Sequence, residues 1–350
     1  MELFFLRSLI CCLRFFLYLC SRLYDTMLLE IILIILGIAL VLWGADRFTD
    51  GATGLARMLN VSELVIGLTV VALGTSLPEF MVSFLSVLRG SSDMSVGNII
   101  GSNVFNILVI LGVSAIMRTM TVENSLLRRD IPICLSVSAL LYAFAVSEGT
   151  IVRWEGLMLV AFFCAYLLMA YRIALKDRKA SLSTLAGETA EQETVNAKRP
   201  PIKGVWGALL LILIGMAALV GGGHVLVDNA VKVAYECHVS ESVIGATILA
   251  GGTSLPELAT SVIAARKGSL GLAFGNVIGS NVFNIAFVIG TCSSIVPMAV
   301  TEITQTDWLV LVGSCILVWI VAYTRRELRR WEGILLVLAY LGYLISLLMK

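Results

Sequence analysis

The stretch that decides the fold is residues 67–112, which begin GLTVVALGTSLPEF and end GNIIGSNVFNILVILG. It recurs as residues 245–290, which begin GATILAGGTSLPEL and end GNVIGSNVFNIAFVIG. At a constant offset of 178 residues the two copies are identical at 23 of 46 positions without a gap. Each copy places a glutamate, Glu79 or Glu257, directly after a proline within apolar sequence. Such a duplicated acidic motif indicates a place where cations meet a membrane protein.

The composition places the chain in a lipid bilayer. Of its 350 residues, 59% are hydrophobic and 14% are charged, whereas soluble domains average about 45–50% and about 25%. Long apolar runs between short charged loops are typical of spanning helices of about 20 residues. The eight cysteines show no CxxC spacing and there are only two histidines, so disulfide, zinc, haem and histidine-relay chemistry have no support. We therefore predict an all-α polytopic membrane protein.

Hydropathy predicts ten spans in two halves. They cover residues 28–46, 61–88, 94–117, 127–147, 151–173, 204–227, 239–265, 270–296, 306–324 and 331–348. The polar stretch 176–203 lacks hydrophobic periodicity and reads as a linker between a first five-helix repeat, 27–175, and a second, 204–350. An odd number of spans per repeat inserts the second copy upside down, and inverted repeats are typical of secondary transporters.

The loop charges predict the orientation. The loops on one side hold 18 Lys and Arg residues, and those on the other side hold four from residue 27 onward. The positive-inside rule puts the richer side, including the linker 176–203, in the cytoplasm of a cell whose inner (cytoplasmic) membrane the chain spans, with the C-terminus outside.

Residues 1–26 have no counterpart in the second half and are interrupted by Arg7, Arg14 and Arg22. An upstream start codon, with Met27 as the true beginning, is the favoured interpretation, and an uncleaved signal-like anchor is the alternative. We leave this N-terminal extension out of the predicted fold.

The first part of each motif has the features of a cation site. A glutamate at membrane depth costs about 2.5–3.5 kcal/mol on insertion scales, so a functional role is the default. Pro78 and Pro256 interrupt their helices, which frees the carbonyls of Gly74 and Gly252 and loosens the turns around Ala72 and Ala250. Unwound carbonyls at this depth are tolerated where they line a cavity or bind an ion.

The second part, GNxxGSNVFN, places polar side chains on one helix face. Asn98, Ser102 and Asn106 are spaced by four residues, and Gly97 and Gly101 let another backbone approach. For Asn98 and Asn103, polar contacts between helices and ion ligation are equally good interpretations. For the remaining hydroxyls and amides we favour ion ligation, namely for Ser102, Asn106, Ser280 and Asn284.

The motif supplies carboxylates, hydroxyls, amides and carbonyls, without thiolate or imidazole. All-oxygen sets suit Ca²⁺, which takes about 6–8 oxygens, and also Na⁺. A site that serves both ions in turn belongs to an antiporter that needs no cofactor.

At these residues the chain resembles the calcium/cation antiporter superfamily, and specifically bacterial members of the sodium/calcium exchanger family. The resemblance covers residues 28–348, and GTSLPE and GSNVFNI look like that family's repeats. It implies ten helices, alternating access by movement of the first and sixth helices, and Glu79 and Glu257 as carboxylates shared by calcium and sodium. It also implies side-chain ligands at Thr75, Ser76, Thr253, Ser254, Ser102, Ser280 and Asn106, with carbonyls from Ala72 and Ala250.

One position departs from the family pattern. Several relatives, including the potassium-dependent exchangers, carry aspartate in one repeat where this chain has Asn284. Both repeats here have asparagine, so the resemblance does not fix the sodium stoichiometry, a role for potassium or the preferred divalent ion.

Three functions compete with sodium-driven Ca²⁺ export. Ca²⁺/H⁺ exchange would protonate the two glutamates during the return step. A cation channel would use them as a selectivity ring, although broken helices in inverted repeats favour alternating access. An intramembrane enzyme with Ser76 as nucleophile is disfavoured because no histidine or lysine lies near it in sequence. We expect no enzyme activity, no nucleic-acid partner and a monomer.

Overall fold

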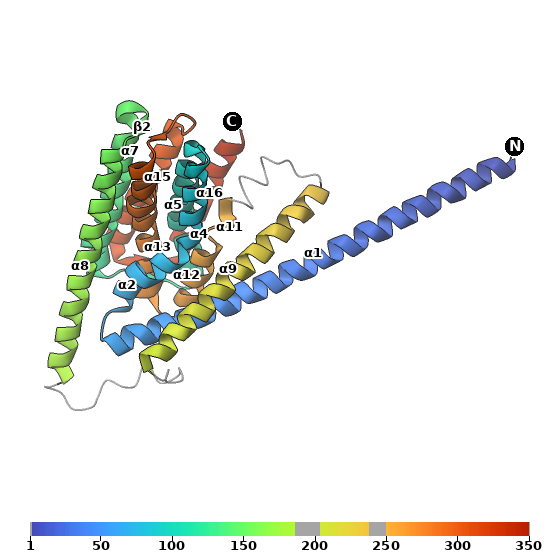
Figure 1. Cartoon of the computed structure of the whole chain (residues 1–350). Coiled ribbons are helices and arrows are strands. Elements are labelled where there is room, and N and C mark those ends of the chain that lie inside the picture. The colour runs from blue at the N-terminus through green and yellow to red at the C-terminus, as the bar shows by residue number, and fades with distance from the viewer. Residues whose placement is uncertain (1, 186–203, 238–249, 350) are drawn as a thin grey trace.

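The computed structural model describes residues 2–185, 204–237 and 250–349, and this part of the chain is almost entirely helical (Figure 1). The α-helices are α1 (Glu2–Leu59), α2 (Glu63–Ile66), α3 (Ala72–Thr75), α4 (Leu77–Leu88), α5 (Ser92–Phe105), α6 (Leu111–Met117), α7 (Ile131–Glu148), α8 (Arg153–Leu185), α9 (Gly204–Glu236), α11 (Ala250–Gly252), α12 (Leu255–Lys267), α13 (Leu270–Val282), α14 (Gly290–Ile295), α15 (Gln305–Arg325) and α16 (Arg330–Leu348). The π-helical segments are η1 (Gly67–Val71), η2 (Asn106–Ile110), η3 (Leu126–Asp130) and η5 (Phe283–Ile289). The short strands are β1 (Met120–Thr121), β2 (Thr150–Ile151), β3 (Met298–Ala299) and β4 (Glu327–Leu328).

These elements confirm a polytopic membrane protein. Within the described residues, eight helices are long and apolar enough to span a bilayer, and Glu63–Thr75 with Leu77–Leu88, bent by 46°, makes a ninth. The remaining predicted span, 239–265, lies partly outside the described residues, which include it only from Ala250 onward. The ten-span prediction therefore stays a prediction at this one place.

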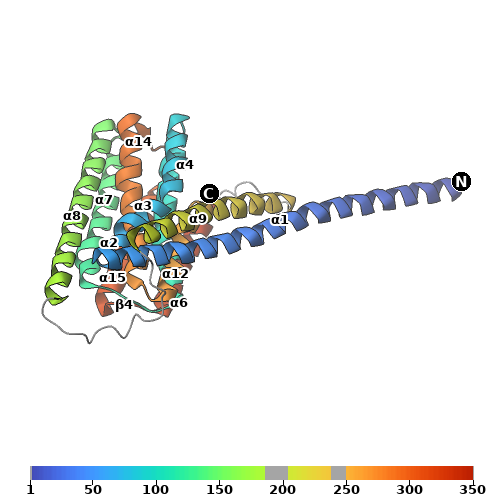
Figure 2. The ribbon, with the colours of Figure 1, turned by 60° about the horizontal axis from the view of Figure 1, so that its bottom comes forward.

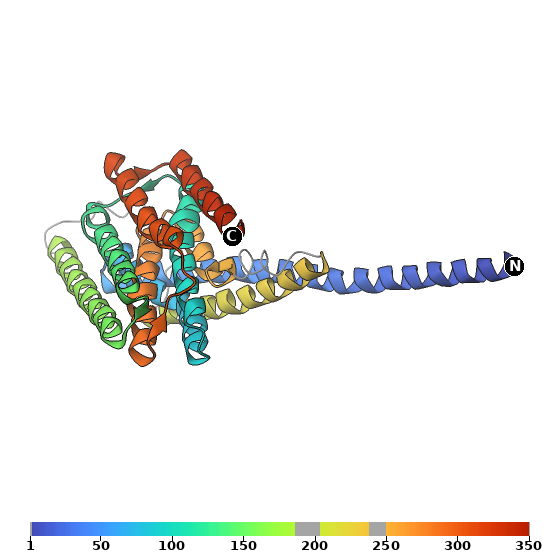
Figure 3. The same ribbon diagram turned by 90° about the horizontal axis from the view of Figure 1, so that it is seen from above.

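The first helix is longer than predicted. It runs without a break from Glu2 to Leu59, and its N-terminal part extends beyond the bundle (Figures 1 and 3). The apolar span within it is Met27–Leu59. The helix itself shows no boundary at residue 26, so the separate N-terminal extension remains a prediction.

The duplicated segments form the centre of the molecule. The most apolar window of the span Leu270–Ile295 is 94% buried inside the protein, against 17% for Met27–Leu59. Helices α7 and α8 stand on one side of this centre, and α1 and α9 cross it obliquely on another (Figure 2). The second copy of the motif is therefore shielded from lipid, while the first helix faces it.

Two short antiparallel ribbons report the inverted symmetry directly. Strand β1 pairs with β4, with Met120 opposite Leu328, and β2 pairs with β3, with Thr150 opposite Ala299. The repeat offset makes β3 the equivalent of β1 and β4 the equivalent of β2. Each repeat therefore lends one strand to each ribbon, which is the pairing expected of two copies related by a pseudo-twofold axis.

A seam of small residues holds α1 against α9, which lie side by side (Figures 1 and 3). A Cβ added to Gly44 would lie 2.8 Å from the Gly215 carbonyl oxygen, and one added to Gly37 would lie 2.9 Å from that of Gly222. A third contact, one heptad on, joins Gly51 to the carbonyl of Ala208 at 2.8 Å. Small residues at such contacts let backbones meet closely, so α1 and α9 form one tightly packed antiparallel pair.

The GxxxG of the second copy works as predicted. Added Cβ atoms would lie 2.6 Å from the Leu64 carbonyl oxygen at Gly275 and 2.7 Å from that of Leu68 at Gly279. In the first copy, by contrast, no described atom comes within 4 Å of a Cβ at Gly101. The segment that the offset would place there, 242–250, lies almost wholly outside the described residues.

We predict that Gly44→Ala destabilises the protein, because the new methyl group meets backbone atoms that cannot move aside. Overpacking of this kind costs about 1–3 kcal/mol. The readout is the thermal unfolding midpoint of the purified protein in detergent. Gly342→Ala is the matched control, since no described atom lies within 4 Å of that position, and alanine is the better helix former. An unchanged midpoint for Gly44→Ala would contradict the close-packed seam.

Candidate cation-binding site

Both copies of GTSLPE break their helix at the same residue and in the same way. Ser76 between α3 and α4 has φ −88° and ψ 9°, and Ser254 between α11 and α12 has φ −90° and ψ 10°. In each case the proline occupies the first turn of the following helix, where its missing N–H is not needed. This geometry places Glu79 and Glu257 in the first turn of α4 and α12.

The two breaks meet across the repeats. Ser76 Oγ donates to Glu257 Oε1 at 2.8 Å, and Ser254 Oγ donates to Glu79 Oε1 at 3.0 Å. All four side chains have no exposed surface. The two glutamates, 178 residues apart in sequence, therefore share one buried site, as the inverted symmetry predicts.

The asparagines of GSNVFN lock the repeats together beside this site. Asn103 Nδ2 donates to the Asn281 carbonyl at 3.2 Å, and Asn281 Nδ2 returns the bond to the Asn103 carbonyl at 3.1 Å. Their side-chain oxygens accept from Asn106 Nδ2 at 3.0 Å and from Asn284 Nδ2 at 3.1 Å. This closed ring of four asparagines fixes which way the amide groups of Asn106 and Asn284 point.

Once these bonds are made, six oxygen atoms remain without a hydrogen-bond partner in the described part of the chain. They form three symmetric pairs: Oε2 of Glu79 and Glu257, Oγ of Ser102 and Ser280, and Oδ1 of Asn106 and Asn284. Buried polar atoms without a partner are rare in folded proteins, and each calls for an explanation. A bound cation would explain all six, because each is a donor atom of the kind that Ca²⁺ and Na⁺ take.

The other predicted ligands differ in how they are engaged. Thr75 Oγ1 lies 3.0 Å from Asn276 Oδ1 and 3.1 Å from the Val71 carbonyl, while Thr253 Oγ1 has no partner among the described residues. The Ala72 carbonyl accepts from the Ser76 amide at 3.1 Å, so the turn is closed there. Ala250 is the first residue of α11. Ligation by these four residues stays a prediction.

Sequence reasoning missed the partners of the first asparagine in each motif. Asn98 Nδ2 donates to Ser83 Oγ at 3.0 Å, and Asn276 Nδ2 donates to Ser261 Oγ at 2.8 Å. The signal was present, because Ser83 and Ser261 are themselves related by the offset of 178. Asn98 and Asn103 thus make contacts between helices, which was one of their two interpretations.

Pattern analysis also missed the local helix geometry at the second asparagine. Asn106 begins the π-helical segment η2, and Asn284 lies in η5. A π-bulge inserts an extra residue into an α-helix and is frequent at functional sites. It changes which side chains of the helix share a face, so residues beyond it cannot be placed from a 3.6-residue period.

The electrostatics of the site favour a cation. Among the described residues, the ion pairs involve neither Glu79 nor Glu257. Burying a carboxylate without a compensating charge is strongly unfavourable. Two ionised glutamates carry the charge that one divalent ion or two monovalent ions would neutralise.

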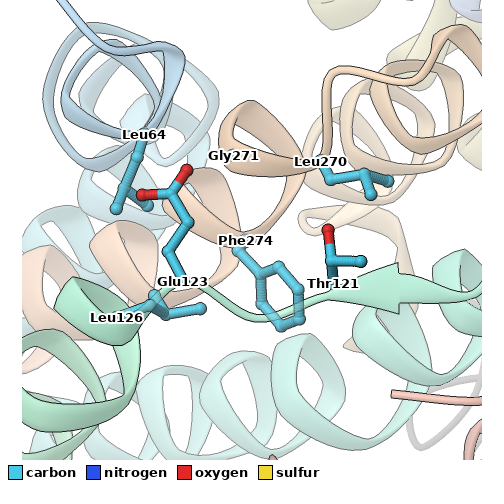
Figure 4. Close-up of a pocket in the computed structure, with 7 residues that line it drawn as sticks. All are labelled: Leu64, Thr121, Glu123, Leu126, Leu270, Gly271 and Phe274. Atoms are coloured by element: carbon cyan, nitrogen blue, oxygen red, sulfur yellow. The ribbon is translucent and has the colours of Figure 1, made fainter. Parts of the chain in front are cut away.

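A cavity of about 630 Å³ leads to the broken helices from between α4 and α9. Its walls reach the site through Pro78, Gly252, Thr253 and Pro256. A second hollow of about 40 Å³, drawn in Figure 4, lies among Leu64, Glu123 and Phe274, away from both motifs. Only the larger cavity joins the duplicated segments to the surface.

The sequence profile of the family described as sodium/calcium exchanger protein matches residues 29–172 and 207–349. The chain belongs to this family. It is 35% identical over 323 residues to the inner membrane protein YrbG of Escherichia coli, covering 92% of this chain and 97% of that protein. It is 30% identical over 343 residues to the sodium/calcium exchanger MaX1 of Methanosarcina acetivorans, covering 90% and 97%.

The solved structures agree. The sodium-calcium exchanger NCX_Mj, soaked with Na⁺ and Ca²⁺, superposes with a TM-score of 0.75 at 31% identity, covering 91% of this chain and 98% of that one. The resemblance seen in the motifs is thereby confirmed, and with it the exchanger fold. As a member of this family the chain is a multi-pass cation antiporter, and these exchangers are transporters rather than enzymes.

We predict opposite stabilities for two adjacent substitutions. Asn103→Ala removes two bonds of the asparagine ring and strands Asn284 Nδ2, at a cost of about 1–3 kcal/mol. Ser102→Ala deletes a hydroxyl that has no partner among the described residues, and leaves stability unchanged or raised. The measurement is the unfolding midpoint in detergent without added Ca²⁺. A loss at Ser102 equal to that at Asn103 would contradict the division into lock and ligand residues.

Proposed function

We propose that this antiporter exchanges Ca²⁺ for Na⁺ across the cytoplasmic membrane by alternating access, with Glu79 and Glu257 as the shared ligands. The observation that carries the proposal is the set of six buried oxygens without a partner, two from carboxylates, two from hydroxyls and two from amides. Six oxygens and two negative charges match the lower end of the Ca²⁺ coordination range, about 6–8 oxygens.

The same set can serve sodium. The amide and hydroxyl oxygens lie on both sides of the glutamate pair by symmetry, so more than one small cation can be shared among them. MaX1 is named a sodium/calcium exchanger, and NCX_Mj was soaked with both ions. These relatives support the same pair of ions here.

The cavity supports access from outside in this conformation. Its α4 wall runs from Leu77 to Leu85, toward Arg89, and its α9 wall runs from Leu219 to Asp228, toward Glu236. The charge distribution of the loops places both of these helix ends on the outer side, with the linker 176–203 in the cytoplasm and the C-terminus outside. Ions would then enter along α9 and reach Glu79 and Glu257 at the helix breaks.

We predict that Glu79→Gln and Glu257→Gln each lower Ca²⁺ affinity about 30-fold or more and abolish exchange. Loss of one partner from a buried charge contact costs about 2–5 kcal/mol. Affinity is measured by isothermal titration of the purified protein, and exchange by ⁴⁵Ca²⁺ uptake into proteoliposomes. Glu302→Gln, an exposed carboxylate away from the site, is the matched control. Full exchange in both glutamate variants would refute the site.

The coupling ion has its own test. Proteoliposomes loaded with Na⁺ should take up ⁴⁵Ca²⁺ in Na⁺-free medium, and a protonophore should leave this uptake unchanged. Uptake that ignores the sodium gradient and collapses with the protonophore would replace Na⁺ by H⁺ as the coupling ion. Replacing external Ca²⁺ by Mg²⁺ or Mn²⁺ in the same assay determines the preferred divalent ion.

A further inference from the structure

An ion-pair cluster joins α1 to α12 at one end of the bundle. Lys267 Nζ lies 2.6 Å from Asp46 Oδ1 and 2.8 Å from Asp50 Oδ1, and also donates to the Asp46 carbonyl at 3.0 Å. The three side chains are 21%, 40% and 26% exposed, so the lysine is shielded more than either acid. Asp46 and Asp50 lie one helical turn apart and grip the lysine together. We call this cluster the inner latch, since the loop charges place it on the cytoplasmic side.

The repeat offset of 178 gives the inner latch a counterpart. Asp50 corresponds to Asp228 on α9, Lys267 to Arg89 at the end of α4, and Asp46 to His224. An acid and a base are thus retained at equivalent places in both repeats, outside the ion site. No ion pair within the described residues includes Asp228 or Arg89.

This second set of residues flanks the cavity instead of closing it. Asp228 and His224 line the α9 wall of the 630 Å³ cavity, and Leu85, one turn before Arg89, lines its α4 wall. Helix α1 packs on α12 at the inner latch, whereas α9 and α4 form opposite walls of the cavity. The two equivalent places in the fold are therefore in opposite states, one joined and one open.

We infer that Asp228 and Arg89 form a reciprocal outer latch, which pairs when the carrier faces the cytoplasm and while the inner latch is broken. The inference rests on the proposed alternating access. An inverted repeat that exchanges the conformations of its halves must exchange these contacts too. Each latch would hold one end of the tightly packed α1–α9 pair against the bundle, so that both ends cannot open at once.

The two latches are unequal. The inner latch offers two carboxylates to its lysine, whereas the outer latch offers one carboxylate and the imidazole of His224. A base gripped by two acids gains more than a base with one. With equal helix packing at both ends, this difference favours the state in which the inner latch is closed and the cavity open, which is the state seen here.

Cross-linking tests the outer latch without any transported ion. The variant Arg89→Cys with Asp228→Cys should form an intramolecular disulfide under mild oxidation of the full-length protein, each single variant controlling for the native cysteines. Adding Lys267→Met breaks the inner latch and should speed cross-linking about tenfold, which corresponds to about 1.4 kcal/mol in the conformational equilibrium. Arg266→Met, an exposed neighbour outside the inner latch, should not. Absence of the disulfide, or equal rates in all three backgrounds, would overturn the outer latch.

Charge exchange supplies a second test, in proteoliposomes. Asp228→Arg and Arg89→Asp should each slow ⁴⁵Ca²⁺ exchange about tenfold, and the double variant should recover most of the wild-type rate. Failure of the double variant to recover, with both single variants impaired and folded by size exclusion, would overturn the pairing. If the wild-type protein showed no Ca²⁺ exchange at all, the proposed function would fail, while the cross-linking result would still decide whether the two latches alternate.

Discussion

The rest of the structure depends on buried polar groups that only the other repeat can satisfy. Ser76 and Ser254 donate to the glutamates of the opposite copy, and Asn103 and Asn281 exchange bonds through their own backbones. In an apolar environment without water, each of these groups would be costly unless it were paired. The two halves therefore cannot be separated or shifted in register without exposing several polar groups at once.

This constraint divides the polar residues of the motif into two kinds. Asparagines that face the other repeat are fully bonded and rigid, and they hold Asn106 and Asn284 with their oxygens turned toward the site. The atoms left over are all oxygens and occur in symmetric pairs. A rigid outer ring that orients an inner set of ligands is the arrangement that ion recognition requires.

Movement must then occur elsewhere. The centre around α13 is packed by glycine contacts to α2 and η1 and is locked by the asparagine ring. Helices α1 and α9 share their own small-residue seam, lie mostly at the lipid-facing surface and border the cavity. A pair of helices that packs well on itself and is held to the bundle by ion pairs at its ends can change position without disturbing the ligands.

The sequence by itself determined the repeat, its inversion and the identity of the buried oxygen donors. Those depend on an exact offset of 178 residues and on glutamates at membrane depth, neither of which needs coordinates. Only the tertiary structure decided that Ser83 holds Asn98, that η2 and η5 shift the helical register at Asn106 and Asn284, and that Lys267 is paired while Arg89 stands beside an open cavity. These facts concern which atoms meet across elements far apart in sequence, and a pattern that repeats identically in both halves cannot show which half is open.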